Sequence, residues 1–195
     1  MMRTATMKRQ TAETNISTTL NIDGTGKSEI ATGIGFFDHM LLLLTKHGFM
    51  DLQLIAQGDL QVDGHHTVED TGIVLGQALA KALGDKSGIK RYGTAFVPMD
   101  EALAMVSLDI SGRPFLVFDV AIPSERIGDF DSELTEEFLR ALSVHAGLTL
   151  HVRLLSGKNS HHIVEAIFKA LGRALDEAAS IDERIVGVMS SKGML

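Results

Sequence analysis

Histidine and glutamate recur in one pattern at two places in the chain. The residues from His65 to Glu69 read H-H-T-V-E, and those from His161 to Glu165 read H-H-I-V-E, 96 residues later. On a helix, residues 65 and 69 share a face and residues 66 and 69 are neighbours, whereas residues 65 and 66 diverge by about 100°. One metal ion cannot easily bind both adjacent imidazoles. The spacing therefore predicts that the two imidazoles of each pair face two different metal ions.

The two motifs and two further histidines supply the candidate metal ligands. These are His39, His65, His66, Glu69, His145, His161, His162 and Glu165. The set divides evenly into two sites of three histidines and one glutamate, and the spacing leaves the assignment of single ligands open. The chain has no cysteine, which excludes thiolate sites. Nitrogen and oxygen ligands suit Mn²⁺, Fe²⁺, Co²⁺ or Zn²⁺, and five or six coordination favours manganese over zinc.

The charge balance limits the partners of this protein. Lys and Arg number 18 and Asp and Glu 25, for a net charge of −7. Such an acidic chain is not typical of a nucleic-acid-binding protein, and its net negative charge repels anions. Binding of a phosphate would therefore require a local group of cationic and polar side chains. The candidates are Arg91, Arg113, Lys169, Ser190, Ser191 and Lys192.

The elements that position these residues also come in two copies. The pattern from Glu13 to Gly24 recurs from Glu101 to Gly112, 88 residues later. Alternation and turn residues predict a hairpin of strands at 14–22 and 28–34, then a helix at 36–47, a strand at 51–56 and a helix at 67–83. The second half repeats this order with strands at 102–110 and 114–122, a helix at 132–146, a strand at 148–155 and a helix at 160–178. Each half is thus ββαβα, and the second has a longer loop at 122–132.

This order predicts an α+β fold, in which two pseudo-equivalent ββαβα halves pack as a sandwich of sheets and helices. We expect the first half at 1–88, the second at 89–182, and a C-terminal tail at 183–195 that closes over the substrate. No apolar run approaches the roughly 18 residues of a membrane span, and the first residues lack the core of a signal peptide. We therefore expect a cytoplasmic protein without a membrane partner.

Seven ordered motifs carry a resemblance to a known family. They are R-x-T-x-E-T at 9–14, G-x-G-F-x-D-H-M at 33–40, H-H-T-x-E-D at 65–70, R-x-G at 91–93, P-M-D-E-A at 98–102, G-K-N-x-H-H-x-x-E-A-x-F-K at 157–169 and S-S-K-G at 190–193. Over essentially its whole length the chain resembles the stand-alone imidazoleglycerol-phosphate dehydratases of histidine biosynthesis. One departure is Leu42-Leu43, where many members have Asp-Gln.

The resemblance implies a hydro-lyase that converts D-erythro-imidazoleglycerol phosphate to imidazole acetol phosphate and water, through an imidazolate that bridges two metal ions. It implies two Mn²⁺ per active site, no redox cofactor, and a homo-oligomer of 24 subunits built from trimers. The catalytic residues would be Glu13, His39 and Asp100, with Glu13 moving protons. The substrate contacts would be Glu13, His39, His47, His65, Glu69, Arg91, Arg113, Lys169, Ser190, Ser191 and Lys192.

Two other functions fit the same residues. A binuclear metallohydrolase acting on a phosphate ester could use the same ligands, and it would release inorganic phosphate. A non-catalytic assembly could use the metal ions only to join subunits. Loss of turnover without loss of assembly in a Glu13 variant would argue against that assembly.

Overall fold

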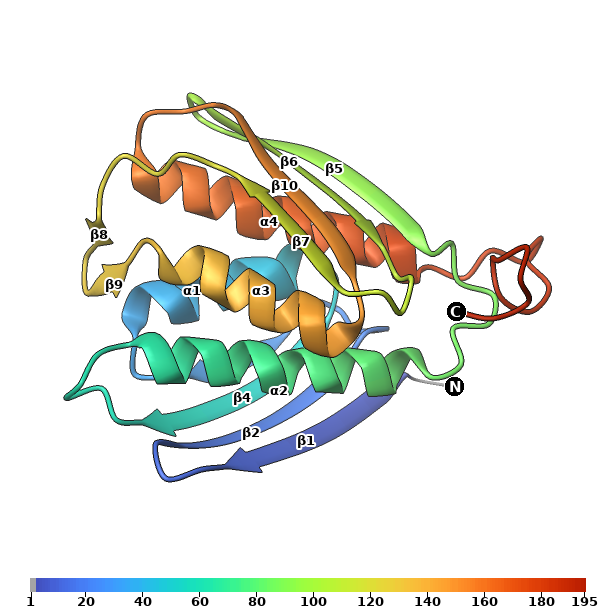
Figure 1. Cartoon of the computed structure of the whole chain (residues 1–195), viewed down its shortest axis with the longest axis horizontal. Coiled ribbons are helices and arrows are strands. Elements are labelled where there is room, and N and C mark those ends of the chain that lie inside the picture. Colours follow the sequence, from blue (N-terminus) through green and yellow to red (C-terminus); the bar gives the residue numbers. More distant parts are fainter. Residues whose placement is uncertain (1–2) are drawn as a thin grey trace.

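The computed structural model describes residues 3–195, and it shows two four-stranded sheets with four helices between them (Figure 1). The first half comprises β1 (Thr4–Gln10), β2 (Thr14–Asn21), β3 (Ser28–Ala31), α1 (Gly35–His47), β4 (Asp51–Gly58) and α2 (His65–Leu83). The second comprises β5 (Tyr92–Met99), β6 (Ala102–Asp109), β7 (Phe115–Asp119), the short pair β8 (Arg126–Ile127) and β9 (Phe130–Asp131), α3 (Leu134–Ala146), β10 (Thr149–Ser156) and α4 (Ser160–Ala179). The predicted two-half α+β sandwich is confirmed.

Each half carries one strand more than predicted, at its beginning. Strand β1 shows only Ala5 fully buried, while its other residues are polar or partly exposed, so its apolar alternation is too weak to read from the sequence. The buried face of strand β5 carries the small residues Gly93 and Ala95 beside Val97, and the strand also contains the exposed Pro98. Apart from the short pair β8 and β9, which lies in the predicted loop of the second half, each half is therefore βββαβα.

The extra strands also change the pairing. The expected hairpin of 14–22 with 28–34 is wrong, because β2 forms its hairpin with β1 and pairs on its other side with β4. Strand β3 instead runs parallel to β4, in the order β1-β2-β4-β3, and the second sheet has the matching order β5-β6-β10-β7. A parallel pair needs a crossover, and α1 supplies it in the first half.

The helices pair across the two halves. Helix α1 packs on α4, and α2 packs on α3. Between them lies the core, in which Phe37 and Phe138 meet edge to face and Phe138 stacks on Phe168, with ring centroids 5.2 and 5.4 Å apart. Both helix pairs therefore bring residues from distant parts of the chain side by side.

Two glycines allow this close helix packing. A Cβ at Gly172 of α4 would lie 2.5 Å from the carbonyl oxygen of Leu44 in α1, and a Cβ at Gly76 of α2 would lie 2.9 Å from that of Leu142 in α3. The two glycines are separated by the same 96 residues as the two His-His motifs. Only glycine permits such an approach of helix backbones. The duplication thus extends to the contacts that set the spacing of the site.

Within residues 3–195 no helix is both long enough and apolar enough to cross a membrane.

Candidate metal centre and active site

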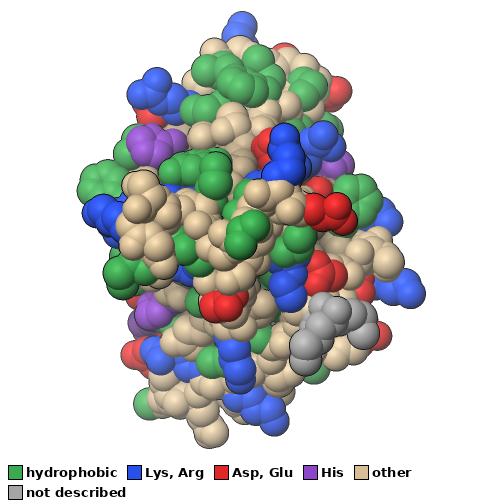
Figure 2. All heavy atoms as spheres, turned by 90° about the vertical axis from the view of Figure 1, so that its right-hand side faces the viewer, with side chains coloured by type: hydrophobic (Ala, Val, Ile, Leu, Met, Phe, Trp, Pro, Cys, Tyr) green, Lys and Arg blue, Asp and Glu red, His purple; other side chains and the backbone are tan. Residues whose placement is uncertain are grey.

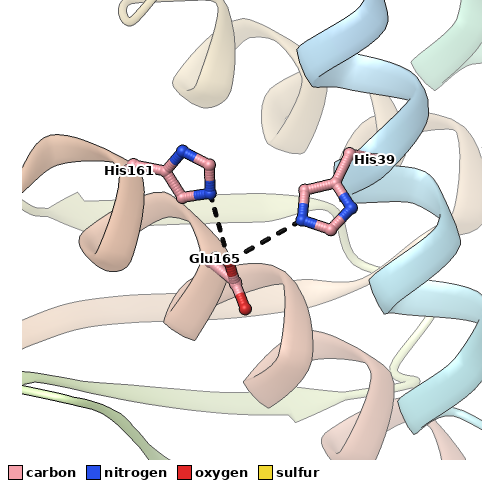
Figure 3. A group of neighbouring side chains, drawn as sticks. All are labelled: His39, His161 and Glu165. Carbon is pink, nitrogen blue, oxygen red and sulfur yellow. Dashed lines mark ion pairs between the residues drawn. The ribbon is translucent and has the colours of Figure 1, made fainter.

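The first group of metal-ligating side chains comes from α1 and α4. His39, His161 and Glu165 each place one ligand atom within 4.8 Å of the others (Figure 3). The Glu165 Oε2 atom lies 3.2 Å from Nε2 of His161 and 3.7 Å from Nε2 of His39. The Glu165 side chain is only 9% exposed, whereas the two imidazoles are about half exposed. A nearly buried carboxylate faced by two imidazole nitrogens fits a divalent cation.

Local capping places this group at the start of the two helices. The backbone N–H and the hydroxyl of Thr32 both donate to Oδ1 of Asp38, which ties the first turn of α1 to the chain that enters it. The Asn159 side chain caps α4 by accepting from the backbone N–H groups of His161 and His162. The Asn159 bonds satisfy helix-end donors, and both sets of bonds hold the starts of the helices, near which the imidazoles stand.

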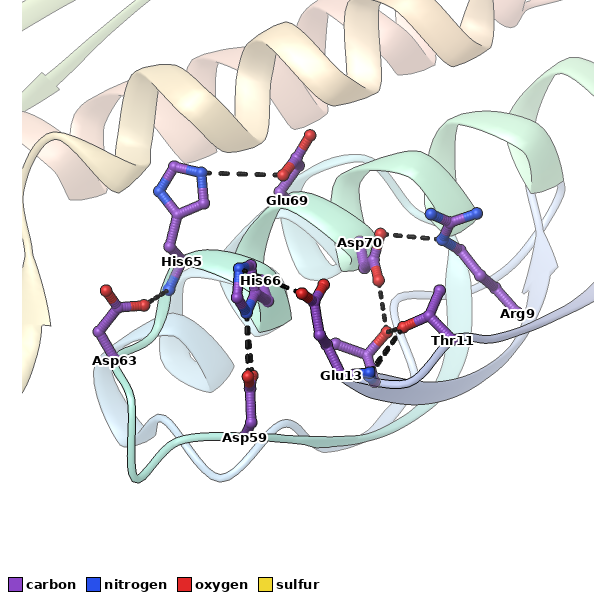
Figure 4. A network of polar contacts seen from close by, with 10 residues as sticks. Arg9, Thr11, Glu13, Asp59, Asp63, His65, His66, Glu69 and Asp70 are labelled. Carbon is purple, nitrogen blue, oxygen red and sulfur yellow. Dashed lines mark hydrogen bonds and ion pairs between the residues drawn. The ribbon is translucent and has the colours of Figure 1, made fainter.

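The second group comes from α2 and α3. His65, Glu69 and Glu137 again hold ligand atoms within 4.8 Å of one another. The His65 Nε2 atom lies 3.7 Å from Oε2 of Glu69, and Oδ1 of Asp63 accepts from the His65 backbone N–H (Figure 4). The i, i+4 pairing of histidine with glutamate predicted from the spacing is therefore found in both motifs.

His145 does not join the second group within the chain, where Glu137 supplies the third potential ligand atom, so His145 as a ligand stays a prediction. Both lie on α3, but eight residues of helix separate them by about 12 Å. The His145 Cβ packs against Gly76, about three turns along α2 from His65. Sequence reasoning chose the histidine and missed Glu137, although Glu137 stands near the start of α3 as His39 stands near the start of α1.

The second imidazole of each motif points away from these groups. His66 and His162 belong to neither group, and their rings approach Asp59 and Glu101 instead, so the adjacent imidazoles diverge. The ring planes of His65 and His66 are 87° apart, and those of His161 and His162 are 80° apart.

A carboxylate orients each of these outward rings. Nδ1 of His66 lies 3.0 Å from Asp59, and Nδ1 of His162 lies 2.7 Å from Glu101. The hydrogen bonds raise the pKa of both imidazoles, and the bond to His162 lowers the pKa of Glu101 to about 2. An ionised carboxylate only accepts, so Nδ1 carries the proton and Nε2 is the atom left to bind a metal. Sequence reasoning missed Asp59 and did not assign this role to Glu101.

Glu13 and Asp100 stand beside these outward imidazoles. Glu13 Oε1 lies 3.8 Å from Nε2 of His66, and Asp100 Oδ2 lies 3.7 Å from Nε2 of His162. Both carboxylates are more than half exposed. Each follows the first strand of its half, Glu13 between β1 and β2 and Asp100 between β5 and β6. Each of these exposed carboxylates is therefore placed to contact a molecule that binds beside the neighbouring imidazole.

A buried network holds the turn that carries Glu13. Asp70 of α2 accepts from Arg9 Nε at 2.8 Å and also from the hydroxyl of Thr14 (Figure 4). The hydroxyl of Thr11 accepts from the backbone N–H groups of Glu13 and Thr14. These bonds tie the turn to the helix that carries His66, which explains the R-x-T-x-E-T spacing.

The predicted phosphate residues form two groups. Arg91 is nearly buried, and its guanidinium makes a bidentate ion pair with Asp109 and donates to the carbonyl oxygen of Met189 in the tail. Arg113 approaches the same Asp109 at 3.7 Å. Arg91, Ser190 and Ser191 line one hollow of about 810 Å³. Seen from this end of the molecule, Lys and Arg side chains lie scattered among apolar and acidic ones (Figure 2).

Lys169 lies elsewhere, beside the first metal-ligating group. Its Nζ atom is 2.6 Å from Oε1 of Glu165. Burial acts to raise the pKa of Glu165, but the Lys169 hydrogen bond and charge lower it overall. His47, at the end of α1, has its pKa lowered by burial and by the charges of Lys169 and Arg173. The expected convergence of Lys169 with the arginines is not found within one chain.

The two ends of the helical layer therefore carry different chemistry. Helix α4 has 20 residues, and His161 is in its first turn while the tail follows its end (Figure 1). A helix of that length spans about 30 Å. One small substrate cannot reach both the metal-ligating groups and the Arg91 hollow of the same chain.

A duplicated α+β sandwich with a histidine–carboxylate group on each pair of helices fits the class of metal-dependent enzymes. A sequence model named "Imidazoleglycerol-phosphate dehydratase" matches residues 32–175. The chain is 64% identical over 191 residues to the dehydratase of that name from Clostridium botulinum, covering 98% of this chain and 97% of the relative. It is 60% identical over 195 residues to that of Acetivibrio thermocellus, covering all of both chains.

Solved structures agree. The Staphylococcus aureus imidazoleglycerol-phosphate dehydratase matches with a TM-score of 0.84 at 45% identity, covering 92% of this chain and 99% of that one. The Pyrococcus furiosus enzyme matches with a TM-score of 0.84 at 40% identity, covering 97% and 100%. The chain therefore belongs to the imidazoleglycerol-phosphate dehydratase family, and it is a metal-dependent hydro-lyase of histidine biosynthesis.

Proposed function

We propose that the protein dehydrates D-erythro-imidazoleglycerol phosphate to imidazole acetol phosphate, with two Mn²⁺ ions in each active site and with the imidazole of the substrate bridging them. The observation that carries this proposal is the pair of histidine–carboxylate groups, His39–His161–Glu165 and His65–Glu69–Glu137, next to two imidazoles that point outward. Mixed imidazole and carboxylate ligands suit manganese.

We propose further that each site is shared between copies of the chain. Each group offers three ligands, and His66 and His162 turn Nε2 away from their neighbours while a carboxylate holds Nδ1. Nδ1 hydrogen-bonded to a carboxylate is the usual arrangement of a metal-binding imidazole. These two rings would complete the groups of adjacent subunits. Sharing also accounts for the separation of the Arg91 hollow from the metal ligands, and we propose an assembly of 24 subunits built from trimers.

When bound, the two ions would stabilise the substrate's imidazole in its deprotonated form and so help expel hydroxide from the adjacent side-chain carbon. The remaining steps belong to protein side chains. We assign Glu13 to remove the proton from the next carbon, which leaves an enol that tautomerises to the ketone. Asp100, in the equivalent place beside His162, would bind the substrate's polar side chain. The catalytic set is completed by His39.

The phosphate would be bound where subunits meet. Arg91, Arg113, Ser190 and Ser191 lie at one end of the molecule, and we propose that Lys192 joins them from the tail. Lys169 would reach the same substrate from a neighbouring subunit. The remaining proposed contacts are His47, His65 and Glu69. The division into residues 1–88, 89–182 and 183–195 and the cytoplasmic location stay predictions.

Incubation of the Mn²⁺-loaded protein with imidazoleglycerol phosphate tests this function directly. We expect an enolisable ketone and no inorganic phosphate. Release of phosphate without ketone would instead identify the metallohydrolase. A Glu13→Gln variant should lose turnover but keep its assembly, and full turnover in that variant would remove Glu13 from the mechanism.

Chelation tests the shared sites. Removal of metal at neutral pH should shrink the particle in solution, because the ions join subunits. His66→Ala and His162→Ala should lower metal content, whereas His151→Ala is the matched control, since His151 is an exposed residue of β10. A metal-free particle of full size would show that the ions are not shared.

A further inference from the structure

The two metal-ligating groups occupy equivalent places but differ in their ligands. On α1 and α4 the group contains two imidazoles and one carboxylate, His39, His161 and Glu165. On α2 and α3 it contains one imidazole and two carboxylates, His65, Glu69 and Glu137. The difference lies in the shorter helix of each pair, which contributes a histidine in the first group and a glutamate in the second.

We propose that the two sites bind divalent cations unequally, and that Glu137 determines this difference. The group with Glu137 would prefer cations that favour oxygen ligands, such as Mn²⁺ and Mg²⁺. The group with His39 would prefer Zn²⁺ and Co²⁺. This inference rests on the proposed function in one respect, namely that each group holds one ion.

Ligand chemistry supports the proposal. Imidazole suits zinc and other late transition metals, whereas carboxylate suits magnesium and manganese. Replacing one imidazole by a carboxylate also adds one negative charge. The added negative charge favours dications that prefer oxygen ligands over those that prefer imidazole.

The surroundings of the two groups widen the difference. Glu165 is nearly buried and shares its second oxygen with Lys169 at 2.6 Å, so one cation already balances the only carboxylate of that group. Glu137 meets Arg140 only at 3.7 Å, while Arg140 has its short contact with Glu136. The second group thus keeps two carboxylates against one distant cation.

Solvent exposure acts in the same direction. The Glu69 side chain is 40% exposed and that of Glu137 28% exposed, against 9% for Glu165. A more exposed site lets the ion keep water ligands. Magnesium and manganese sites commonly retain such waters, whereas a histidine-rich site held by a buried carboxylate suits zinc.

The test is a metal titration of the assembled protein after chelation and dialysis. Mn²⁺ and Zn²⁺ are added separately, and heat of binding and bound metal are measured. We expect two steps for Zn²⁺, with apparent affinities at least about tenfold apart, the size of effect that even indirect changes at metal sites produce. Manganese should show a smaller gap or fill the Glu137 site first.

Variants show which step of the metal titration belongs to which site. Glu137→His makes the two groups alike, so the weaker Zn²⁺ step should tighten and merge with the stronger one. Glu137→Gln should weaken Mn²⁺ binding in one step only. Glu133→Gln is the matched control, because Glu133 is an exposed carboxylate at the start of the same helix and belongs to neither group.

Two outcomes overturn the proposal. The first is equal affinity of both sites for each cation in the natural protein. The second is a titration that Glu137→His and Glu137→Gln leave unchanged, which would make Glu137 only a partner of Arg140. Turnover of imidazoleglycerol phosphate is measured beside the titration. Unequal metal binding without turnover would refute the proposed function alone, and turnover with equal sites would refute this inference alone.

Discussion

Glu101→Gln should weaken metal binding at His162 while leaving the fold intact. Glu101 makes two kinds of contact. Its Oε1 atom accepts from the backbone N–H groups of Lys158 at 3.1 Å and Asn159 at 2.7 Å, and its Oε2 atom accepts from Nδ1 of His162 at 2.7 Å. Glutamine keeps the first oxygen, so the loop before α4 keeps both of its hydrogen bonds.

In the second contact, the substitution replaces a hydrogen-bond acceptor by a donor. The amide that replaces Oε2 donates hydrogen bonds, so it favours the tautomer of His162 in which Nδ1 accepts and the proton sits on Nε2. A protonated Nε2 cannot bind a metal. To ligate, the ring must return its proton to Nδ1, where it meets a second donor.

We expect a loss of 10- to 100-fold in metal affinity, as for other groups that orient metal-binding imidazoles. The value should fall toward the lower end, because Glu101 is 41% exposed and water can partly replace it. Isothermal titration with Mn²⁺, at a pH well above the usual histidine pKa of about 6.5, keeps protonation of the ring out of the comparison.

A second variant separates orientation from folding. Glu101→Ala removes the loop contacts as well, so it should also lower the melting temperature, whereas Glu101→Gln should not. Nitrogen-15 NMR of the metal-free protein should show the changed tautomer. If the tautomer shifts in Glu101→Gln but the metal affinity does not change, the carboxylate does not act by keeping the proton on Nδ1 and leaving Nε2 to bind a metal.

Three further outcomes follow from the packing. Gly172→Ala should cost about 1–3 kcal/mol of unfolding free energy in urea, because its Cβ would press on the Leu44 carbonyl, and it should weaken metal binding by moving α1 from α4. Arg91→Ala should cost about 1–3 kcal/mol and speed proteolysis of the tail, since its bond to Met189 is lost; unchanged cleavage would mean that other contacts hold the tail. Truncation after Val188 should raise KM and lower the melting temperature less than Arg91→Ala does, because Arg91 keeps its ion pair with Asp109, and unchanged kinetics would make the last residues a frayed terminus.

Short-range patterns were readable because they depend on backbone geometry alone. The i, i+4 spacing in both His-His motifs predicted the pairing of His65 with Glu69 and of His161 with Glu165, and both pairs are present. Divergence of adjacent imidazoles follows from the same helical period. The duplication likewise predicted the two-half sandwich.

Strands without a clear apolar alternation were not readable. Strand β1 buries little besides Ala5, so nothing in its sequence distinguishes it from an extended terminal segment. Its pairing with β2 displaced the predicted hairpin partner, because a strand finds its neighbours by long-range packing and not by its distance along the chain.

The amino-acid sequence by itself determined the duplicated motifs, the fold class and the family, since these rest on local periodicity and on residue types in order. Tertiary structure alone decided which helices meet. It paired α2 with α3, and so brought Glu137, not His145, to His65. It also set Arg91 and the tail at the opposite end from the metal ligands. Helix crossing and register depend on close packing at positions such as Gly76 and Gly172, and no spacing within one helix reveals them.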